Sequence, residues 1–538
     1  MRLAQTEFEK AVRLAPKDAA AQSALAWVLA QQGQLDPAVK HLRAAILAKP
    51  EFVEARLTLA NILAQLGRVD ESEQELRAAV KVSPDNADAH RALARILSTK
   101  SGDEALAEMQ RAVEVAPKRA DLQDDLGNIL AQRNRDAEAM TAFQEAVRLR
   151  PDFELAHFHL GVEYLQAEQL DNAASELGQA LQLAPRHAEA HYYLAKTLLA
   201  QSKKAEALAE LRQAAVLKPS WFELQVELGI ASQRSGDTDG AIAAFSQALK
   251  LHPQDAELYN DLGLALIQKG DAEGSIPQFK AAVQLRPQDA AFRGNLAIAY
   301  MQLTDFDAAA TELETAVKVA PADASLHYNL GLTYKLKDKL DQAVTEFQAA
   351  IRITPDLADA RYALGVLFWQ RGEFDNATQE LQKALETKPD YAEAHYTLGT
   401  VYKQQGKLAE SATELKDAIR LQPEFAGAHT TLAGVLRQLG DSEGAAAEAK
   451  EGARISALVN NLQAATVSTN SGKRLLAAGD LQAAIAQFRS AIHSEPKYAA
   501  AHYQLGLALQ QSGQTEEAKK EFEKAAELNP QLTPPTKR

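Results

Sequence analysis

Apolar residues recur along this chain with helical spacing, and their pattern repeats every 34 residues. In the stretch 392–425, Leu398 and Tyr402 are four residues apart and therefore share one face of a helix. Gly406 interrupts the pattern, and a second apolar face that contains Leu415 continues toward Pro423. The stretch therefore predicts two amphipathic helices joined by a tight turn.

Proline marks the end of each period. One 34-residue step upstream, Leu364, Phe368 and Leu381 precede Pro389, and the same order precedes Pro355. Proline cannot continue a helix, and it moves the preceding residue out of the helical region. Each of these prolines is therefore predicted to end the second helix of a unit. They stand at positions 16, 50, 84, 117, 151, 185, 219, 253, 287, 321, 355, 389, 423, 496 and 530.

Glycine recurs at two places within the unit. At the fifteenth place it predicts a turn with positive φ, as at Gly372 and Gly406. At the eighth place, as at Gly331 and Gly399, it lies inside the first helix, where it costs about 1 kcal/mol relative to alanine. We expect that the second helix approaches closely at this place and offsets the cost.

The period and the order Leu-Gly, aromatic, Ala, large apolar and Pro resemble the tetratricopeptide repeat. The resemblance covers residues 19–532 and about fifteen units. It implies an all-α fold, a right-handed α-solenoid superhelix of helix-turn-helix repeats whose first helices line a concave groove. The fourth place departs from the family pattern, because it holds mostly histidine or another polar residue.

The frame divides the chain into five segments. Residues 1–18 form a half repeat with only the second helix, and 19–459 hold thirteen units. Residues 460–464 are an insertion that predicts a kink, 465–532 hold two further units, and 533–538 are expected to be a disordered tail.

Two segments depart from the regular pattern. The thirteenth unit lacks its proline, so a long helix is predicted near 442–465, with Ile455, Leu458 and Leu462 on one face. At the start of the chain, helix 2–14 is expected to expose an apolar stripe of Leu3, Phe8 and Val12. The stripe has two explanations. It marks a truncated start, or it is a docking edge for another domain or for a second copy of the chain.

Composition excludes several classes of protein. The net charge of −14 argues against a general nucleic-acid binder, which carries a basic face. There is no cysteine, so disulfides and cysteine-ligated metals are excluded. The start has no signal-peptide pattern, and no apolar run approaches the roughly 18–20 residues of a membrane span. We therefore expect a cytoplasmic chain without membrane insertion, with an exported mature fragment as the alternative.

The sequence contains no recognised catalytic motif, and we expect no enzyme activity, no cofactor and no metal. Histidine occupies the fourth place of a unit at His90, His157, His191, His327, His395, His429 and His502. Equivalent places in neighbouring repeats are about 8–10 Å apart, too far for two imidazoles to share one zinc ion. We expect these rings to replace the usual aromatic packing residue. The local cluster of His157, His187 and His191 is the one alternative metal site.

The inner face of units ten to thirteen is the candidate binding surface. Place five holds Tyr328, Tyr362 and Tyr396, and place twelve holds Lys335, Trp369, Lys403 and Arg437. Aromatic rings supply rigid contact area, and lysine and arginine bind carboxylates. Asn295 and Asn329 at place six are similar to the asparagine ladder of O-linked N-acetylglucosamine transferases, with Asp125 and Asp261 at equivalent places. The alternative for the tyrosines is that they are ordinary helix-surface residues.

The function predicted from these features is a non-catalytic scaffold or adaptor that binds peptide segments of partner proteins in the groove. The half repeat at the start offers a possible site of self-association. One alternative is the substrate-recognition arm of a larger glycosyltransferase, which would need a catalytic domain after the repeats. Another is a subunit of an envelope or secretion assembly, which would need export.

Overall fold

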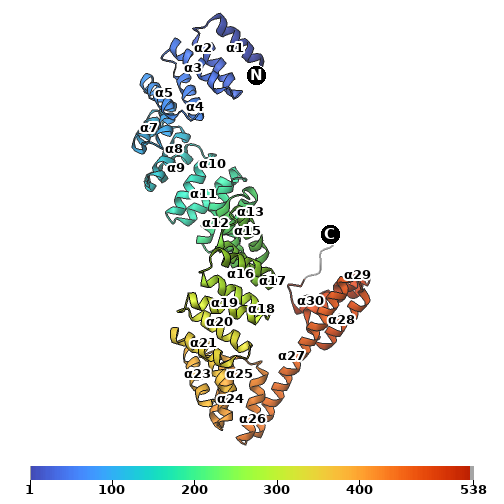
Figure 1. Cartoon of the computed structure of the whole chain (residues 1–538). Coiled ribbons are helices and arrows are strands. Elements are labelled where there is room, and N and C mark those ends of the chain that lie inside the picture. Colours follow the sequence, from blue (N-terminus) through green and yellow to red (C-terminus); the bar gives the residue numbers. More distant parts are fainter. Residues whose placement is uncertain (1, 533–538) are drawn as a thin grey trace. The chain divides into compact units, whose positions relative to one another are not determined.

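The computed structural model describes residues 2–532, and these residues form thirty α-helices with no strand among them. Figure 1 shows the helices following one another in chain order. Consecutive helices pack in pairs, and within 1–286 and within 287–538 each pair also contacts the next pair. The predicted all-α solenoid of helix pairs is therefore confirmed. The predicted tail at 533–538 lies outside the described residues.

The chain divides into two compact units, 1–286 and 287–538. The helices of the first unit are α1 Arg2–Leu14, α2 Ala19–Gln31, α3 Leu35–Ala48, α4 Val53–Gln65, α5 Val69–Val82, α6 Ala87–Leu97, α7 Gly102–Val115, α8 Ala120–Gln132, α9 Asp136–Leu149, α10 Glu154–Gln166, α11 Leu170–Leu183, α12 Ala188–Ala200, α13 Lys204–Leu217, α14 Phe222–Arg234, α15 Thr238–Leu251, α16 Ala256–Lys269 and α17 Ala272–Leu285.

The second unit continues the same alternation of first and second helices. Its helices are α18 Ala290–Gln302, α19 Phe306–Val319, α20 Ala324–Leu336, α21 Leu340–Ile353, α22 Ala358–Gln370, α23 Phe374–Thr387, α24 Ala392–Gln404, α25 Leu408–Leu421, α26 Ala426–Gln438, α27 Ser442–Ala477, α28 Leu481–Ser494, α29 Ala499–Gln511 and α30 Thr515–Leu528.

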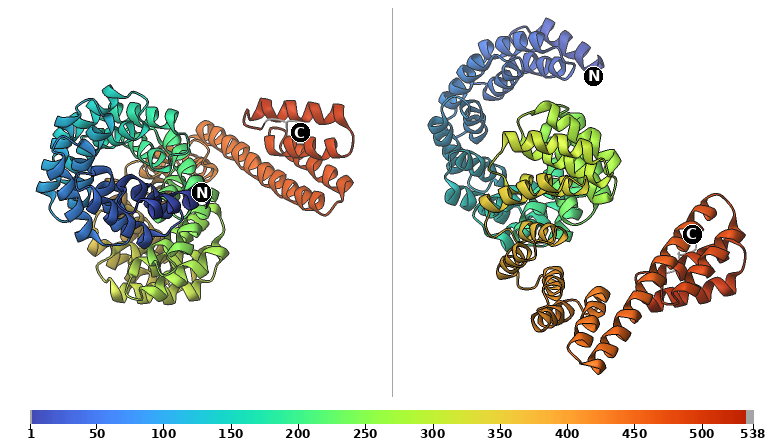
Figure 2. Two further views of the ribbon diagram at one scale, coloured as in Figure 1. Left: turned by 90° about the horizontal axis from the view of Figure 1, so that it is seen from above. Right: turned by 60° about the horizontal axis from the view of Figure 1, so that its bottom comes forward.

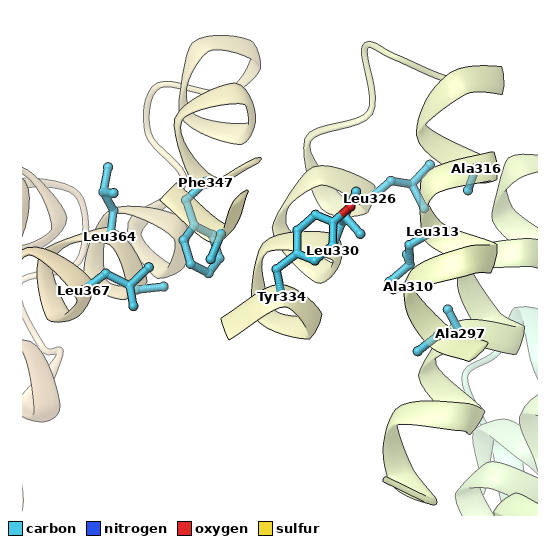
Figure 3. Close-up of a cluster of buried hydrophobic side chains, with 13 residues drawn as sticks. Ala297, Ala310, Leu313, Ala316, Leu326, Leu330, Tyr334, Phe347, Leu364 and Leu367 are labelled. Carbon is cyan, nitrogen blue, oxygen red and sulfur yellow. The ribbon is translucent and has the colours of Figure 1, made fainter. Parts of the chain in front are cut away.

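The core of each repeat lies between its two helices and the first helix of the next repeat. Figure 3 shows one such cluster, in which Phe347 of α21 is fully buried near Leu330 and Tyr334 of α20 and Leu364 of α22. Burial of a side chain of this size contributes roughly 1.5–3 kcal/mol. A Cβ at Gly331 would lie only 2.7 Å from the Phe347 ring. The close approach predicted from the eighth-place glycines is therefore confirmed.

In most repeats, though not in the shorter turn between α6 and α7, the turn between the two helices contains one residue with positive φ. Gly372 and Gly406 adopt φ of 76° and 75° there, as the pattern predicted. Some repeats have no glycine at this place, and the residue that replaces it still has positive φ, as in Thr304 at 60°. The turn geometry is therefore imposed by the packing of the two helices, and glycine is the residue that adopts it without steric cost.

The irregular segment before residue 480 is a single helix. The predicted helix near 442–465 is present as α27, and it extends twelve residues further, to Ala477. Residues 460–464 lie inside it, and Figure 2 shows it as one unbroken helix. Its first half packs on α26 and its second half on α28 and α29. The change of direction expected in the stack of repeats at this insertion stays a prediction.

The apolar stripe expected on the first helix is smaller than predicted. Leu3 is 85% exposed, as expected. Phe8 and Val12, however, pack against the cluster formed by α2, α3 and α4, so that prediction was wrong for these two residues. The second helix of a repeat also contacts the first helix of the following repeat, and α2 supplies that partner. Self-association through α1 stays a prediction.

Candidate protein-binding surface

The predicted surface residues lie on four consecutive first helices, α20, α22, α24 and α26. Each place-five residue is seven residues before the place-twelve residue of the same helix, which corresponds to about 10 Å along the helix axis. α22 contacts α24, and α24 contacts α26. The tyrosines therefore form one row and the residues of place twelve a second, parallel row on the same helices.

Two of the three tyrosine rings in the first row, those of Tyr362 and Tyr396, pack against the aromatic residue that ends their own repeat. The ring centroids of Tyr362 and Tyr391 are 4.9 Å apart, and those of Tyr396 and Phe425 are 4.7 Å apart. Tyr192 and Trp221 in the first unit repeat the arrangement at 4.6 Å. Sequence reasoning missed Tyr391 and Phe425, although their position directly after the Pro-Asp or Pro-Glu pair was a visible signal.

The tyrosine rings of this surface are partly buried, and burial affects the pKa values of some of them. Burial raises the pKa of Tyr328 and of Tyr362. It also raises the pKa of Tyr391, together with the negative charge of Asp359, whose carboxylate accepts a hydrogen bond from the phenol. The phenol groups therefore stay neutral and able to donate hydrogen bonds at neutral pH. Lys388 places its ammonium 4.3 Å from the centroid of Tyr391.

Three of the four residues in the second row are cations without a partner. Within residues 2–532, the side chains of Lys335, Lys403 and Arg437 form no ion pair and no hydrogen bond. Lys403 extends toward α26, where a Cβ at Gly434 would be 3.3 Å from its ammonium. Trp369, the fourth member, donates a hydrogen bond from Nε1 to Oε1 of Gln404 at 3.1 Å.

The residues of the proposed asparagine ladder lie on α8, α16, α18 and α20, and the ladder stays a prediction. Asn295 lies on α18 and Asn329 on α20, and both are partly buried. Asp125 instead pairs with Arg91 of the preceding repeat. Asp261 is partly buried, and burial raises its pKa. Equivalent places in the repeats therefore carry different contacts.

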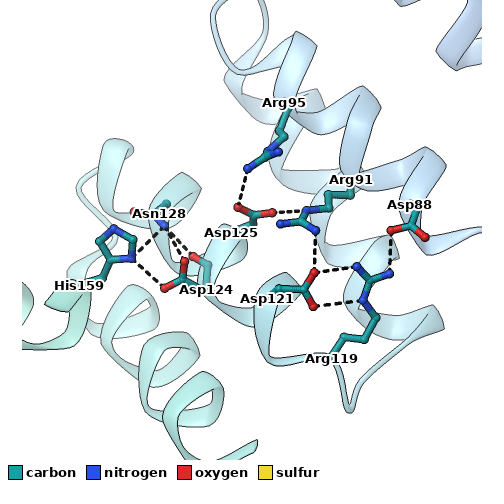
Figure 4. Close-up of polar contacts among 9 residues, drawn as sticks. All are labelled: Asp88, Arg91, Arg95, Arg119, Asp121, Asp124, Asp125, Asn128 and His159. Atoms are coloured by element: carbon teal, nitrogen blue, oxygen red, sulfur yellow. Dashed lines mark hydrogen bonds and ion pairs between the residues drawn. The ribbon is translucent and has the colours of Figure 1, made fainter. Parts of the chain in front are cut away.

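A contrasting polar cluster lies on α6, α8 and α10 in the first unit (Figure 4). Arg91 binds Asp121 at 2.6 Å and also Asp125. Arg119 binds Asp121 at 2.7 Å, and this contact is the main reason why the pKa of Asp121 is lowered. His159 bonds Asp124 at 2.8 Å. These charged side chains therefore neutralise one another within the chain.

The place-four histidines have a structural role, but a polar one. Nδ1 of His395 is 2.6 Å from Glu414 on the second helix, and Nε2 is 3.0 Å from the carbonyl oxygen of Pro389. Arg361 makes the same two contacts, with Glu380 at 2.7 Å and Pro355 at 2.7 Å. We call this three-part contact the place-four clasp. Most of these rings are buried, as expected for residues that replace a packing aromatic, and they also bridge two acceptors.

The clasp occurs at all seven place-four histidines. Both ring nitrogens face acceptor atoms, and only a protonated imidazole donates from both. The pairs of a histidine with its glutamate and its proline are His90 with Glu108 and Pro84, His157 with Glu176 and Pro151, His191 with Glu210 and Pro185, His327 with Glu346 and Pro321, His395 with Glu414 and Pro389, His429 with Glu448 and Pro423, and His502 with Glu521 and Pro496.

Each of the three histidines in the local cluster contacts a different carboxylate. His157 contacts Glu176 at 2.6 Å, and His191 contacts Glu210 at 2.5 Å. His187 pairs with a third carboxylate, that of Glu154. Over the described part of the chain, no three histidine, cysteine, aspartate or glutamate side chains are grouped so that they could hold a metal ion. In the same residues, no helix has the length and apolar character needed to cross a membrane.

Comparison with known families gives matches along most of the chain. A family described as tetratricopeptide repeat matches residues 2–52, 158–220, 226–290, 295–358 and 396–457, which together cover more than half of the sequence. A second family of the same description matches 38–96 and 475–534, and one described as TPR repeat matches 127–167 and 367–406. No curated protein sequence matches the chain.

Solved structures show partial likeness to the chain. MamA is 27% identical, with a TM-score of 0.29, over 31% of this chain and 96% of MamA. YrrB, described as a TPR protein with an unusual peptide-binding site, is 22% identical, with a TM-score of 0.31, over 34% of this chain and 95% of YrrB. Yeast Tom70 is 17% identical, with a TM-score of 0.36, over 78% of this chain and 96% of Tom70. Because these TM-scores are below 0.5, the family assignment rests on the sequence matches alone.

Proposed function

Because this chain belongs to the tetratricopeptide repeat family, we propose that it is a non-catalytic scaffold that binds acidic peptide segments of partner proteins on the inner face of α20–α26. The observation that carries the proposal is the row of unpaired cations, Lys335, Lys403 and Arg437, beside the row of tyrosines. A carboxylate of the ligand would give these cations the partner that the chain itself does not supply.

The tyrosines contribute a second kind of contact. Tyr362 and Tyr396 are each packed against a second ring, so their orientation is fixed before any ligand binds. A surface whose side chains are already ordered loses less conformational entropy on binding. The alternative role of these rings, as packing residues of the repeat, is compatible with this, because one side of each ring contacts the chain and the other side is partly exposed.

The test uses the full chain and two synthetic peptides with capped ends. One peptide is rich in Asp and Glu, and the other has Asn and Gln at the same positions. Fluorescence anisotropy should show tighter binding of the acidic peptide. The double substitution Lys403→Glu with Arg437→Glu should weaken that binding by about tenfold or more. It removes two exposed ion pairs with the peptide and replaces each of them by a repulsion between like charges.

The matched control is Lys416→Glu with Arg420→Glu on α25, a second helix with two exposed basic residues. This control changes the net charge by the same amount and should leave binding unchanged. Equal binding of the two peptides, or equal loss in the control and the test variant, would overturn the proposal.

A further inference from the structure

A cavity of about 440 Å³ in the first unit is lined by residues of α12, α13 and α14. Its volume is within the range of sites that bind small ligands or single side chains. Leu199, Ile230 and Ala231 form its apolar part. Lys196, Lys204 and Arg234 supply basic groups, one from each of the three helices.

The cavity adjoins the start of α13, one of several second helices that do not begin with a large apolar residue. The first residue of a second helix is often large and apolar, and Leu35, Leu340 and Phe374 pack there against the core. The residue at the equivalent place in α13 is Lys204, which is exposed. The space that leucine or phenylalanine fills elsewhere is therefore left open beside Leu199 and Ile230.

Lys204 also conflicts with the local electrostatics of its helix. The positive end of the helix dipole is at the N-terminus, so a cation there is unfavourable and an anion favourable. From α3 to α30, Lys204 is the only cation that begins a second helix. Such a local conflict is expected where a residue serves binding and not folding.

The charges around the cavity are not balanced by the chain. Glu227 is its one lining carboxylate, and it already accepts a hydrogen bond from Tyr192 at 2.8 Å and lies 4.0 Å from Lys196. Across residues 2–532, the side chains of Lys204 and Arg234 form neither an ion pair nor a hydrogen bond. An apolar cavity beside two unpaired cations is complementary to an apolar side chain flanked by carboxylates.

We propose that this cavity is a second peptide-binding site, and that it takes an aliphatic side chain of an acidic segment whose flanking Asp or Glu residues pair with Lys204 and Arg234. The two cations come from different helices, so two carboxylates on either side of the aliphatic residue fit better than one. The site is separate in sequence from α20–α26, and it does not depend on the function proposed for those helices.

The test is done in the full chain that carries Lys403→Glu with Arg437→Glu, so that the other surface is disabled. The probe is a capped peptide with one leucine between two pairs of glutamates. Its two matched versions have glutamine for glutamate or glycine for leucine. Isothermal titration calorimetry should show binding of the first peptide and at least about tenfold weaker binding of both others, since each loses one of the two interactions.

The decisive variants are Lys204→Leu and Arg234→Ala. Lys204→Leu restores the residue type that other repeats have at this place, so it fills the cavity without harm to folding. It should abolish detectable binding. Arg234→Ala should weaken binding severalfold, as expected for one exposed charge pair. The control Lys203→Leu changes the neighbouring lysine, which does not line the cavity, and should bind as the parent does.

Three results would overturn the proposal. The first is equal affinity for the glutamate and glutamine peptides. The second is unchanged affinity in Lys204→Leu, with a far-UV circular dichroism melt that shows the variant to be folded. Loss of binding in Lys203→Leu to the same degree would also contradict it, because that result would assign the effect to overall charge and not to the cavity.

Discussion

The inner faces of α6–α10 and of α20–α26 use the same places of the repeat in different ways. In α6–α10, Arg91 at place five is paired with Asp121 and Asp125 of the next repeat (Figure 4). In α20–α26, place five holds tyrosines, and Lys335 and Lys403 at place twelve have no partner among the described residues. One face is neutralised by the chain itself, and the other keeps charges available for a ligand.

This difference shows that the fold alone does not decide which face binds a partner. Both stretches consist of helix pairs of the same repeat, although α6 is shorter than the other first helices and the turn after it contains no residue with positive φ. What differs is whether the next repeat supplies an opposite charge within reach. The charged residues of α6–α10 therefore hold neighbouring repeats together, whereas those of α20–α26 are free to act in binding. The following predictions test this distinction.

The largest expected effect is on the stability of α6–α10. Arg91→Ala leaves Asp125, which is 15% exposed, with only a 3.4 Å contact to Arg95. Loss of one partner from a partly buried pair should cost about 2 kcal/mol. Hydrogen exchange of the α6 and α8 amides should then be roughly thirtyfold faster. Protection equal to that of the parent chain would contradict the assigned role of the cluster.

Acid should weaken the same cluster. The pKa of Asp121 is lowered, first by its hydrogen bond from Arg119, so its folded pKa lies below the ordinary value of 3.8. A lowered pKa gives stability above the unfolded pKa that is lost as the pH falls through the folded pKa. Exchange in α6–α8 should therefore rise below about pH 4. Asp121→Asn should reduce this increase in exchange at low pH. If the increase persists in the variant, other carboxylates cause it.

The place-four clasp in α24 should respond to pH in the opposite direction. The pKa of His395 is raised, first by its contact with Glu414, so its folded pKa lies above the ordinary value of 6.5. Its contribution is complete below the unfolded pKa and is lost as the pH rises through the folded pKa, at a cost of about 1 kcal/mol. Exchange in α24 and α25, corrected for the intrinsic rate, should therefore rise as the pH increases above the ordinary histidine pKa of 6.5.

His395→Arg is the matched variant for this prediction. Arg361 already makes the same clasp in the preceding repeat, and an arginine keeps its charge across this pH range. The alkaline loss of protection in α24 should therefore disappear. If His395→Arg and the parent chain lose protection to the same degree, the clasp is not the titrating contact.

The smallest effect is expected for the unpaired cations themselves. Lys335→Ala and Lys403→Ala remove no ion pair, so the free energy of unfolding should change by less than about 0.5 kcal/mol. Chemical denaturation followed by circular dichroism measures this. A loss as large as that of Arg91→Ala would mean that these lysines stabilise the repeats, and the distinction between the two faces would fail.

The sequence by itself determined the features that depend on nearby residues. Prolines and turn glycines placed the ends of the helices, because φ restrictions act within one or two residues. Gly331 predicted the close approach of the second helix, which Phe347 makes, because the glycine and the large apolar residue both recur at fixed places of the repeat. The absence of a proline at the end of the thirteenth unit predicted the long α27, although its end at Ala477 was missed.

Only the tertiary structure decided how equivalent places are used. His395 and Arg361 look unrelated in sequence, yet both join a glutamate about 19 residues later to a proline carbonyl oxygen six residues earlier. Asp125 resembled a ladder residue until its partner Arg91 was located 34 residues upstream. The sequence shows where such charged residues occur, but it does not show which of them are in contact. Their contacts are made between helices, and the distances between helices are set by the packing of whole repeats.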